Sequence, residues 1–414
     1  MPRPHRSIPL LALLLTACGQ KDGAPVDGGT DTADDTAPAT ETDVAGTDTP
    51  DTPDTEVACD PLACPPAPAP TCADATTVST LTPACVEGAC GFTEALSACL
   101  TFEGCDDGAC APLALCDIDF DAAADLATIT ELTLGGGATA DDACCEDFTG
   151  DGIIDNRLGT LNDSLGSLAG LADANVLLAE AMATGNPLWS VLVSPPDPAA
   201  PSTVQIDVVR SLFADADVTA WQSGGASMVG LATDAGPSGT YAPTSRLLGT
   251  VSPSGEVDAT GTVTFALPFV GLLLDVPITS VHLQGSLLLN PPPFSTVLGG
   301  NAGRGAALAG VVRQTDFWDA QNRAFADTCA CAVVNSVSGL LLDATGRCNP
   351  VNTVGCVGPE STVCQGYASS CALLRSLVSA DVDTDGNGTP DAFSTGWWLT
   401  ARTAASFAID ACMP

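Results

Sequence analysis

The sequence predicts an α+β protein, mainly β, whose folded part follows a long segment without a core. Three observations predict this. The cysteines fall into two groups separated by residues 146–328, which contain none. The central region alternates apolar and polar side chains, as half-buried strands do, and one leucine-rich run has helical spacing. We therefore expect a leader over 1–17, a stalk over 18–58, a disulfide-rich module over 59–116 and one β-rich domain over 117–414.

The first 17 residues have the features of an export signal. Arg3 and Arg6 precede an apolar run over residues 8–15, which is too short to span a bilayer. The run ends in the sequence LTAC, whose cysteine is Cys18. This pattern resembles the lipobox of bacterial lipoprotein signal peptides, and an ordinary secretory peptide with a chance cysteine is the alternative. The resemblance implies that Cys18 becomes the new N-terminus and carries a lipid anchor. Since Gly19 and not aspartate follows, it implies the outer membrane or cell surface.

Residues 19–58 consist almost entirely of Asp, Thr, Pro, Ala and Gly. Too few apolar side chains are present to form a core, and like charges with proline keep such a chain extended. We expect a disordered stalk that holds the folded part away from the membrane.

The chain is strongly acidic, with 12 Lys and Arg against 50 Asp and Glu and a formal net charge of −38. A nucleic-acid partner is excluded, because phosphate binding requires clustered basic side chains. The charge attracts cations, so a divalent metal is the first ligand to expect.

The cysteine pattern predicts disulfides, because an exported chain reaches an oxidising compartment. About fifty residues cannot bury enough apolar surface alone, so the module needs bridges for stability. The spacing leaves their connectivity open. Zinc is the alternative, but the module has no histidine. The eight cysteines of the module are Cys59, Cys64, Cys72, Cys85, Cys90, Cys99, Cys105 and Cys110.

The other cysteines indicate that the two ends of the larger domain are covalently joined. Cys116, Cys144 and Cys145 precede the cysteine-free region, and the remaining seven follow it. Both numbers are odd. If the module is self-contained and all the others pair, at least one bridge must connect the two groups. The seven are Cys329, Cys331, Cys348, Cys356, Cys364, Cys371 and Cys412.

Within the larger domain, leucines at three- and four-residue spacing predict one amphipathic helix over 158–182, weakened by glycines. Period-two alternation predicts strands over 204–208 and 262–267. Residues 267–289 are apolar enough to suggest a membrane span, but prolines, Asp275 and His282 interrupt them, so we expect paired strands. Alternating Asp117, Asp119 and Asp121 predict a strand with an acidic face.

Two nine-residue segments have the spacing of calcium ligands. In the first, the ligand positions one, three, five, seven and nine are Asp147, Thr149, Asp151, Ile153 through its carbonyl, and Asp155. In the second, they are Asp383, Asp385, Asn387, Thr389 through its carbonyl, and Asp391. Alternate residues of a tight loop converge on its concave side, and the glycine at position six allows the sharp turn.

Both segments resemble EF-hand-type calcium loops, and in particular those of dockerins and thrombospondin type 3 repeats. They depart from that pattern at position twelve, where Leu158 and Ser394 replace the bidentate glutamate, and Pro390 takes the apolar eighth position of the second. The resemblance implies structural calcium with the weak affinity of extracellular modules, about 10⁻⁴ to 10⁻³ M. Ordinary Asp/Gly turns are the alternative.

The sequence has few of the residues that an enzyme needs. Without the leader it has one histidine, His282, whose apolar neighbours place it on the polar face of a strand. No nucleophile elbow or phosphate loop is present. Trp397 and Trp398 suggest either a sugar-stacking surface or core packing. We therefore assign no catalytic residue.

From Cys116 onward, the chain resembles surface lipoproteins of the myxobacterial kind. The resemblance rests on the stalk, the module, the first loop leading into a leucine-rich helix and the second leading into a terminal strand. This resemblance implies a location at the cell surface and the order of stalk, module and domain, and it implies no activity. We expect a lipid-anchored, non-enzymatic surface protein that binds a surface glycan or protein. A calcium-stabilised extracellular hydrolase and a carrier of an apolar ligand are the alternatives.

Overall fold

The computed structural model describes residues 59–118, 125–166, 173–184, 188–194, 202–213, 228–231, 239–241, 243, 245–269, 272–287, 296–298, 304–336, 338–343, 345–377, 379–403 and 406–408. The leader, Cys18, the stalk and Cys412 lie outside these residues. The described part is mainly β with fewer helices, as the sequence predicts. None of its helices is long and apolar enough to cross a membrane.

The disulfide-rich module is built from hairpins. A short 3₁₀ turn, η1 (Pro61–Ala63), precedes β1 (Thr71–Asp74), β2 (Thr77–Val86) and β3 (Ala89–Ala98), which form a sheet in the order β1-β2-β3. A second hairpin joins β4 (Glu103–Asp106) to β5 (Ala109–Pro112). Both tight turns have two residues at positive φ, Glu87-Gly88 and Asp107-Gly108, as type I′ turns require.

The module closes four disulfides within itself, as its even cysteine number predicts. They are Cys59–Cys85, Cys64–Cys90, Cys72–Cys105 and Cys99–Cys110.

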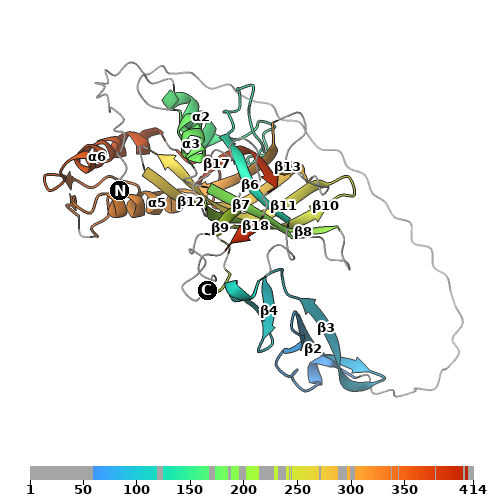
Figure 1. Cartoon of the computed structure of the whole chain (residues 1–414). Helices are drawn as coiled ribbons and strands as arrows, with labels where there is room; N and C mark the ends of the chain where they lie inside the picture. The colour runs from blue at the N-terminus through green and yellow to red at the C-terminus, as the bar shows by residue number, and fades with distance from the viewer. Residues whose placement is uncertain are drawn as a thin grey trace, which may run out of the picture.

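The larger domain is a sheet that closes into a cylinder. The ring runs β10-β11-β12-β14-β17-β6-β7-β8, and β8 pairs in turn with β10, all antiparallel (Figure 1). Strands β8 and β11 contain the predicted strands, and residues 267–286 lie largely in the β11–β12 pair. The ring strands are β6 (Asp125–Leu134), β7 (Leu188–Ser194), β8 (Thr203–Phe213), β10 (Ser245–Val251), β11 (Glu256–Phe269), β12 (Leu272–Ser286), β14 (Ala306–Arg313) and β17 (Ala392–Thr403).

Three short strands extend this sheet. β9 (Met228–Leu231) pairs with β8, β18 (Ser406–Ala408) pairs with β9, and β13 (Thr296–Leu298) pairs with β17.

Side chains fill the cylinder at one level. Trp189 of β7, Phe265 of β11 and Trp397 of β17 come from strands that are not neighbours in the ring, yet their rings meet across the interior. The centroid of Phe265 lies 5.4 Å from that of Trp189 and 6.2 Å from that of Trp397. Eight-stranded cylinders are just wide enough to be filled in this way. Trp397 is therefore a core residue and no sugar platform.

The leucine-rich segment forms two helices, so the prediction of one continuous helix was wrong. They are α2 (Arg157–Gly166) and α3 (Ala174–Ala183). Asp173 starts the second helix, because its side chain accepts from the N–H of Asn175 and caps the N-terminus. The expected acidic strand is also not found at its start, since Asp117 lies in the 3₁₀ turn η2 (Leu115–Asp117). Asp119 and Asp121 lie outside the described residues.

A disulfide-linked helical unit lies beside one end of the cylinder (Figure 1). It contains α5 (Gln314–Thr328), the short strands β15 (Val333–Val334) and β16 (Val351–Asn352), and α6 (Pro359–Leu377). Phe317 of α5 packs on Phe393 of β17 with centroids 5.8 Å apart. Its bridges are Cys329–Cys364, Cys331–Cys356 and Cys348–Cys371.

Candidate metal centre

The first predicted calcium loop, residues 147–155, is closed by its own side chains. Asp147 accepts hydrogen bonds from the N–H groups of Gly150 (2.6 Å), Asp151 (3.2 Å) and Gly152 (2.6 Å). Gly150 and Gly152 have φ values of 75° and 83°, which only glycine adopts readily. The N–H of Gly152, with those of Gly150 and Asp151, lowers the pKa of Asp147. The first ligand position is thus held as a carboxylate at neutral pH.

The other ligand residues of this loop are also fixed. The side chain of Asp151 accepts from the N–H of Ile153 at 2.8 Å, and that of Asp155 accepts from the N–H of Thr149 at 2.9 Å. The structure therefore brings the five predicted ligand residues of the first loop into one compact turn.

The second loop, residues 383–391, repeats this arrangement from an unrelated stretch of sequence. Asp383 accepts from the N–H groups of Gly386 (2.9 Å), Asn387 (3.3 Å) and Gly388 (2.6 Å), again at positions four, five and six. The two glycines have φ values of 71° and 85°. The N–H of Gly388 leads the bonds that lower the pKa of Asp383.

Of the remaining positions in the second loop, position five makes the same bond as in the first, whereas position nine accepts from position two here and from position three there. Asn387 accepts from the N–H of Thr389 at 2.8 Å, as Asp151 does from Ile153 in the first loop. Asp391 accepts from the N–H of Thr384 at 2.8 Å and so closes the loop. Two segments with different flanking elements therefore share the hydrogen bonds of positions one and five and two glycines at positive φ, which favours a common ligand over two chance turns.

A turn elsewhere in the chain shows what an ordinary Asp/Gly turn looks like here. Asp343 accepts from the N–H groups of Thr345 and Arg347 at 2.9 and 2.8 Å, and the bond from Arg347 leads the causes that lower its pKa. Its neighbours in the sequence include Thr345, Gly346 and Arg347, and no other acidic residue occurs within five positions of it. The two candidate loops differ because further oxygen-bearing side chains follow the first aspartate at alternate positions, although no three carboxylates of either loop lie within 4.8 Å of one another. That set of hard oxygens fits calcium.

Position twelve supplies no ligand in either loop. Leu158 lies in the hydrophobic core with 7% of its surface exposed. Ser394 is fully buried, and its hydroxyl is bonded to Asp381. The absence of a bidentate glutamate is consistent with the weak affinity that the sequence predicts.

The two loops come together around β17, which the sequence does not reveal. Ser394 donates from its N–H and its hydroxyl to Asp381, two residues before the second loop. The same hydroxyl accepts from the N–H of Arg157, two residues after the first loop, at 2.8 Å. Burial raises the pKa of Asp381, and the negative charge of Asp155 raises it further. A carboxylate of the first loop therefore acts on the carboxylate that precedes the second loop.

Asn156 fixes the exit of the first loop. Its Oδ1 accepts from the N–H of Gly159 and caps α2, while its Nδ2 donates to the carbonyl oxygens of Gly135 (2.8 Å) and Gly396 (3.2 Å). Gly396 must be glycine, because a Cβ there would lie 2.2 Å from the carbonyl oxygen of Cys144. The loop is thus attached to the rigid cylinder.

His282 has two acidic partners, in agreement with its predicted place on the polar face of a strand. Its Nδ1 lies 3.2 Å from Glu146, the residue before the first loop, and its Nε2 lies 3.0 Å from Asp258 of β11. Both nitrogens are occupied and no nucleophile is among their partners. The arrangement holds the entrance of the first loop against β12.

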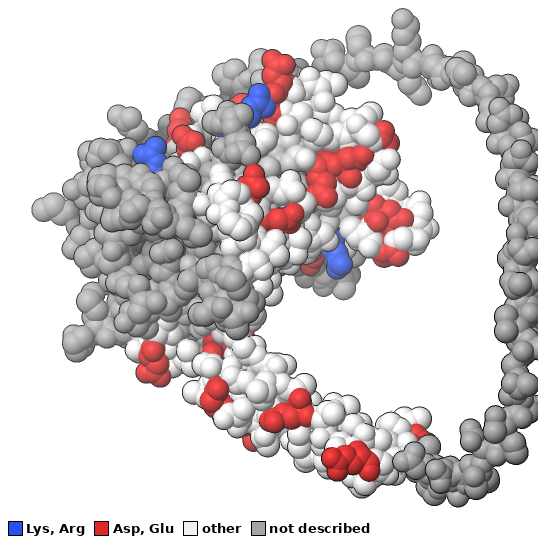
Figure 2. All heavy atoms as spheres, turned by 90° about the vertical axis from the view of Figure 1, so that its right-hand side faces the viewer, with Lys and Arg blue, Asp and Glu red and all other residues white. Residues whose placement is uncertain are grey.

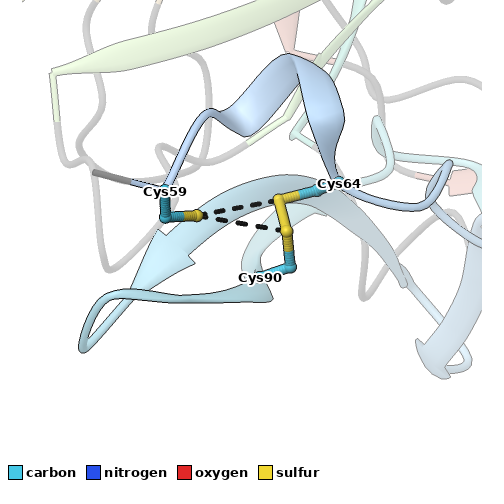
Figure 3. Close-up of side chains that lie close together, drawn as sticks. All are labelled: Cys59, Cys64 and Cys90. Carbon is cyan, nitrogen blue, oxygen red and sulfur yellow. Dashed lines mark hydrogen bonds between the residues drawn. A yellow bond between two sulfur atoms is a disulfide. The ribbon is translucent and has the colours of Figure 1, made fainter. Parts of the chain in front are cut away.

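Two groups of three cysteines also lie close enough to suggest a metal. In the module, the sulfur of Cys59 is 3.9 Å from that of Cys64 and 4.0 Å from that of Cys90 (Figure 3). Cys64 and Cys90 are joined to each other, and Cys59 is joined to Cys85. The second group, Cys331, Cys356 and Cys364, is likewise disulfide-bonded. Disulfide sulfurs are not the thiolates that bind zinc, so neither group is a metal site as it stands.

Comparison with known proteins assigns no family and no function to the chain. No protein-family model, no curated protein and no solved structure matches the chain.

Proposed function

We propose that the protein is a non-enzymatic, lipid-anchored bacterial surface protein, stabilised by calcium and disulfides, that presents a binding face. The observation that carries the calcium part is the shared geometry of loops 147–155 and 383–391. The many disulfides support an exported location. The anchor rests on the sequence around Cys18.

Calcium has a structural role in this proposal. Both loops are anchored to the cylinder, the first through Asn156 and the second directly before β17, and neither has the glutamate whose movement opens sensor helices. The metal would offset the repulsion between Asp155 and Asp381. The packed ring of Trp189, Phe265 and Trp397 disfavours the carrier alternative at that level of the cylinder.

Thermal unfolding with calcium and with a chelator tests the metal sites. At about 10 mM calcium, a site with a Kd of about 10⁻⁴ M stabilises the fold by about 2.7 kcal/mol. We expect a higher melting temperature in calcium, and we expect Asp151→Ala and Asp385→Ala each to remove part of the increase.

Asp343→Ala is the matched control, because it removes a similar backbone-bonded aspartate from a turn without further carboxylates. It should lower the melting temperature in both buffers and leave the calcium effect intact. Equal melting temperatures of the wild type in calcium and in chelator would reject calcium.

The anchor is tested separately by membrane fractionation. Cys18→Ser should move the protein from the membrane to the soluble fraction, with loss of the acyl mass. A wild type without acyl mass would reject the anchor and leave the calcium sites untouched.

A further inference from the structure

The module has one long unprotected sheet edge. β3 is the last strand of the order β1-β2-β3, so within the described residues its outer edge carries no partner strand. Nine of its ten residues are exposed, and it pairs with β2 through ten successive residues without a bulge. Proteins usually protect such edges with lysine, proline or a bulge, and β3 (sequence ACGFTEALSA) has none of these.

The opposite edge of the same sheet is protected. β1 has only four residues and a register shift between Cys72 and Asp74. Since short and irregular edges are the usual protection, the exposure of β3 is a property of that strand and not of the module in general.

One face of β3 presents an acid between two apolar side chains. Phe92, Glu94 and Leu96 alternate along the strand and therefore share a face. Phe92 is 41% exposed and Leu96 is 62% exposed. The hydroxyl of Ser79 donates to the carboxylate of Glu94 at 2.6 Å and orients it, and no ion pair involves Glu94 among the described residues.

The charge of this region defines the kind of partner. No Lys or Arg occurs between residues 22 and 156, and the module has seven acidic residues over 59–116. Acidic side chains are scattered over its visible surface in Figure 2, without a basic one. A second copy of the chain would place acid against acid, so the edge selects a basic partner.

Disulfides hold both ends of the strand. Cys90 near its start is bonded to Cys64, and Cys99 directly after its end is bonded to Cys110. A strand fixed in this way loses little conformational entropy when another strand pairs with it.

We propose that the β3 edge, Ala89–Ala98, binds an extended segment of another polypeptide that adds to the sheet as a fourth strand. Main-chain hydrogen bonds provide affinity in this mode, and alternate side chains provide specificity. The segment has a lysine or arginine facing Glu94, with apolar residues two positions away on either side that face Phe92 and Leu96. The proposal rests on the binding function proposed above, and it identifies the β3 edge as the surface that carries out this function.

The probe is the peptide Thr-Val-Thr-Lys-Thr-Val-Thr, titrated at low salt against the full mature chain by calorimetry. Two control peptides have glutamate in place of lysine, or proline in place of both the threonine and the valine that follow it, so that an N–H facing β3 is lost in either strand direction. We expect saturable binding of the lysine peptide and about tenfold weaker binding of both controls.

Charge reversal on the protein makes the test specific for the edge. Glu94→Lys should lose the lysine peptide and gain the glutamate peptide. Glu87→Lys makes the same change of charge in the β2–β3 turn and should retain the wild-type preference. Leu96→Thr should weaken binding without changing that preference.

Three results would overturn the proposal: no saturable binding of the lysine peptide, equal binding of the proline peptide, or equal effects of Glu94→Lys and Glu87→Lys. Asp151→Ala should bind the peptide as the wild type does, because its loop is not part of the module. A failure of the calcium sites is therefore distinguishable from a failure of the β3 edge.

Discussion

Asp207 is a buried charged residue at the contact between the module and the cylinder. Its side chain is fully buried on β8 and accepts from Arg246 Nε at 2.8 Å, from Tyr241 at 2.9 Å and from Gln205 at 3.0 Å. Arg246 also bonds Glu103 of the module at 2.7 Å. Burial, together with the charge of Asp207, raises the pKa of Tyr241, so the phenol stays neutral and donates.

Replacing Arg246 tests this network. Arg246→Met leaves the carboxylate of Asp207 buried without its cation, and breaking a buried pair costs about 3–5 kcal/mol. We expect a loss of this size in the free energy of unfolding, measured with urea.

Arg304→Met is the matched control, because Arg304 lies over the ring of Trp398 and bonds only the carbonyl of Asp141 among the described residues. It should change the free energy of unfolding by about 1 kcal/mol or less. Equal effects of the two variants would mean that the ion pair contributes no more than a surface arginine.

Asp381 gives stability an unusual dependence on pH. Its folded pKa is raised by burial, so its ionisation in the folded protein is unfavourable and that cost develops as pH rises through the raised value. Asn has no charge, can accept from the N–H of Ser394 through its Oδ1, and can donate from its Nδ2 to the Ser394 hydroxyl oxygen. In calcium-free buffer, Asp381→Asn should therefore be more stable than the wild type at pH 7.

The gain should disappear below the ordinary carboxyl pKa of 3.8, where Asp381 is protonated in both the folded and unfolded states. Thermal unfolding from pH 7 to pH 3 measures the difference. Asp147 and Asp383 act in the opposite direction, because their lowered pKa values stabilise the fold above pH 3.8 and this contribution is lost on acidification. If the extra stability of Asp381→Asn did not change with pH, it could not come from removal of the charge of Asp381.

At the scale of elements, β17 connects the two calcium loops. Its Ser394 bonds Asp381 ahead of the second loop and Arg157 after the first. The side chain of Arg157 also bonds Ser379, which adds a second link between the loop regions. Ordering one loop should therefore help to order the other.

Ser394→Ala should weaken this coupling. With both sites intact, we expect calcium at one loop to raise the affinity of the other, typically by 1–3 kcal/mol, and the effect must be reciprocal. Calorimetric titration of the wild type, Asp151→Ala, Asp385→Ala and each combined with Ser394→Ala measures the coupling energy. Thr400→Ala, at a partly exposed position of the same strand, is the control. Independent binding in the wild type would exclude coupling while leaving both sites in place.

At the scale of the whole molecule, one disulfide extends beyond the described residues. Cys116 is disulfide-bonded, and the other described cysteines, including the adjacent Cys144 and Cys145, pair among themselves. Only Cys18 and Cys412 remain. If Cys18 is acylated on sulfur, we expect Cys412 to be the partner.

Peptide mapping without reduction should find Cys116 linked to Cys412, which would be the one bridge between the two cysteine groups that the odd counts require. Cys412→Ser should leave one free thiol and lower stability by about 2–5 kcal/mol, because the bridge closes a very long loop. A mapped bridge between Cys116 and Cys18 would contradict both this pairing and the lipid anchor.

The sequence by itself determines the features that depend on neighbouring residues. The two nine-residue loops can be predicted because their side chains bond their own backbone. The strands follow from alternation, and the four bridges within the module follow from eight cysteines in about fifty residues.

Only the tertiary structure decides what depends on distant residues. Pairing of β8 with β10 closes the cylinder, β17 brings the two loops together, and Arg246 joins the module to Asp207. The separation of α2 from α3 is also decided by the tertiary structure. Asp173 caps α3 and accepts from the side chain of Asn162 in α2, so the break is stabilised by a contact between the helices. Such contacts join residues far apart in the chain, and their free energy comes from packing and burial that the local sequence does not encode.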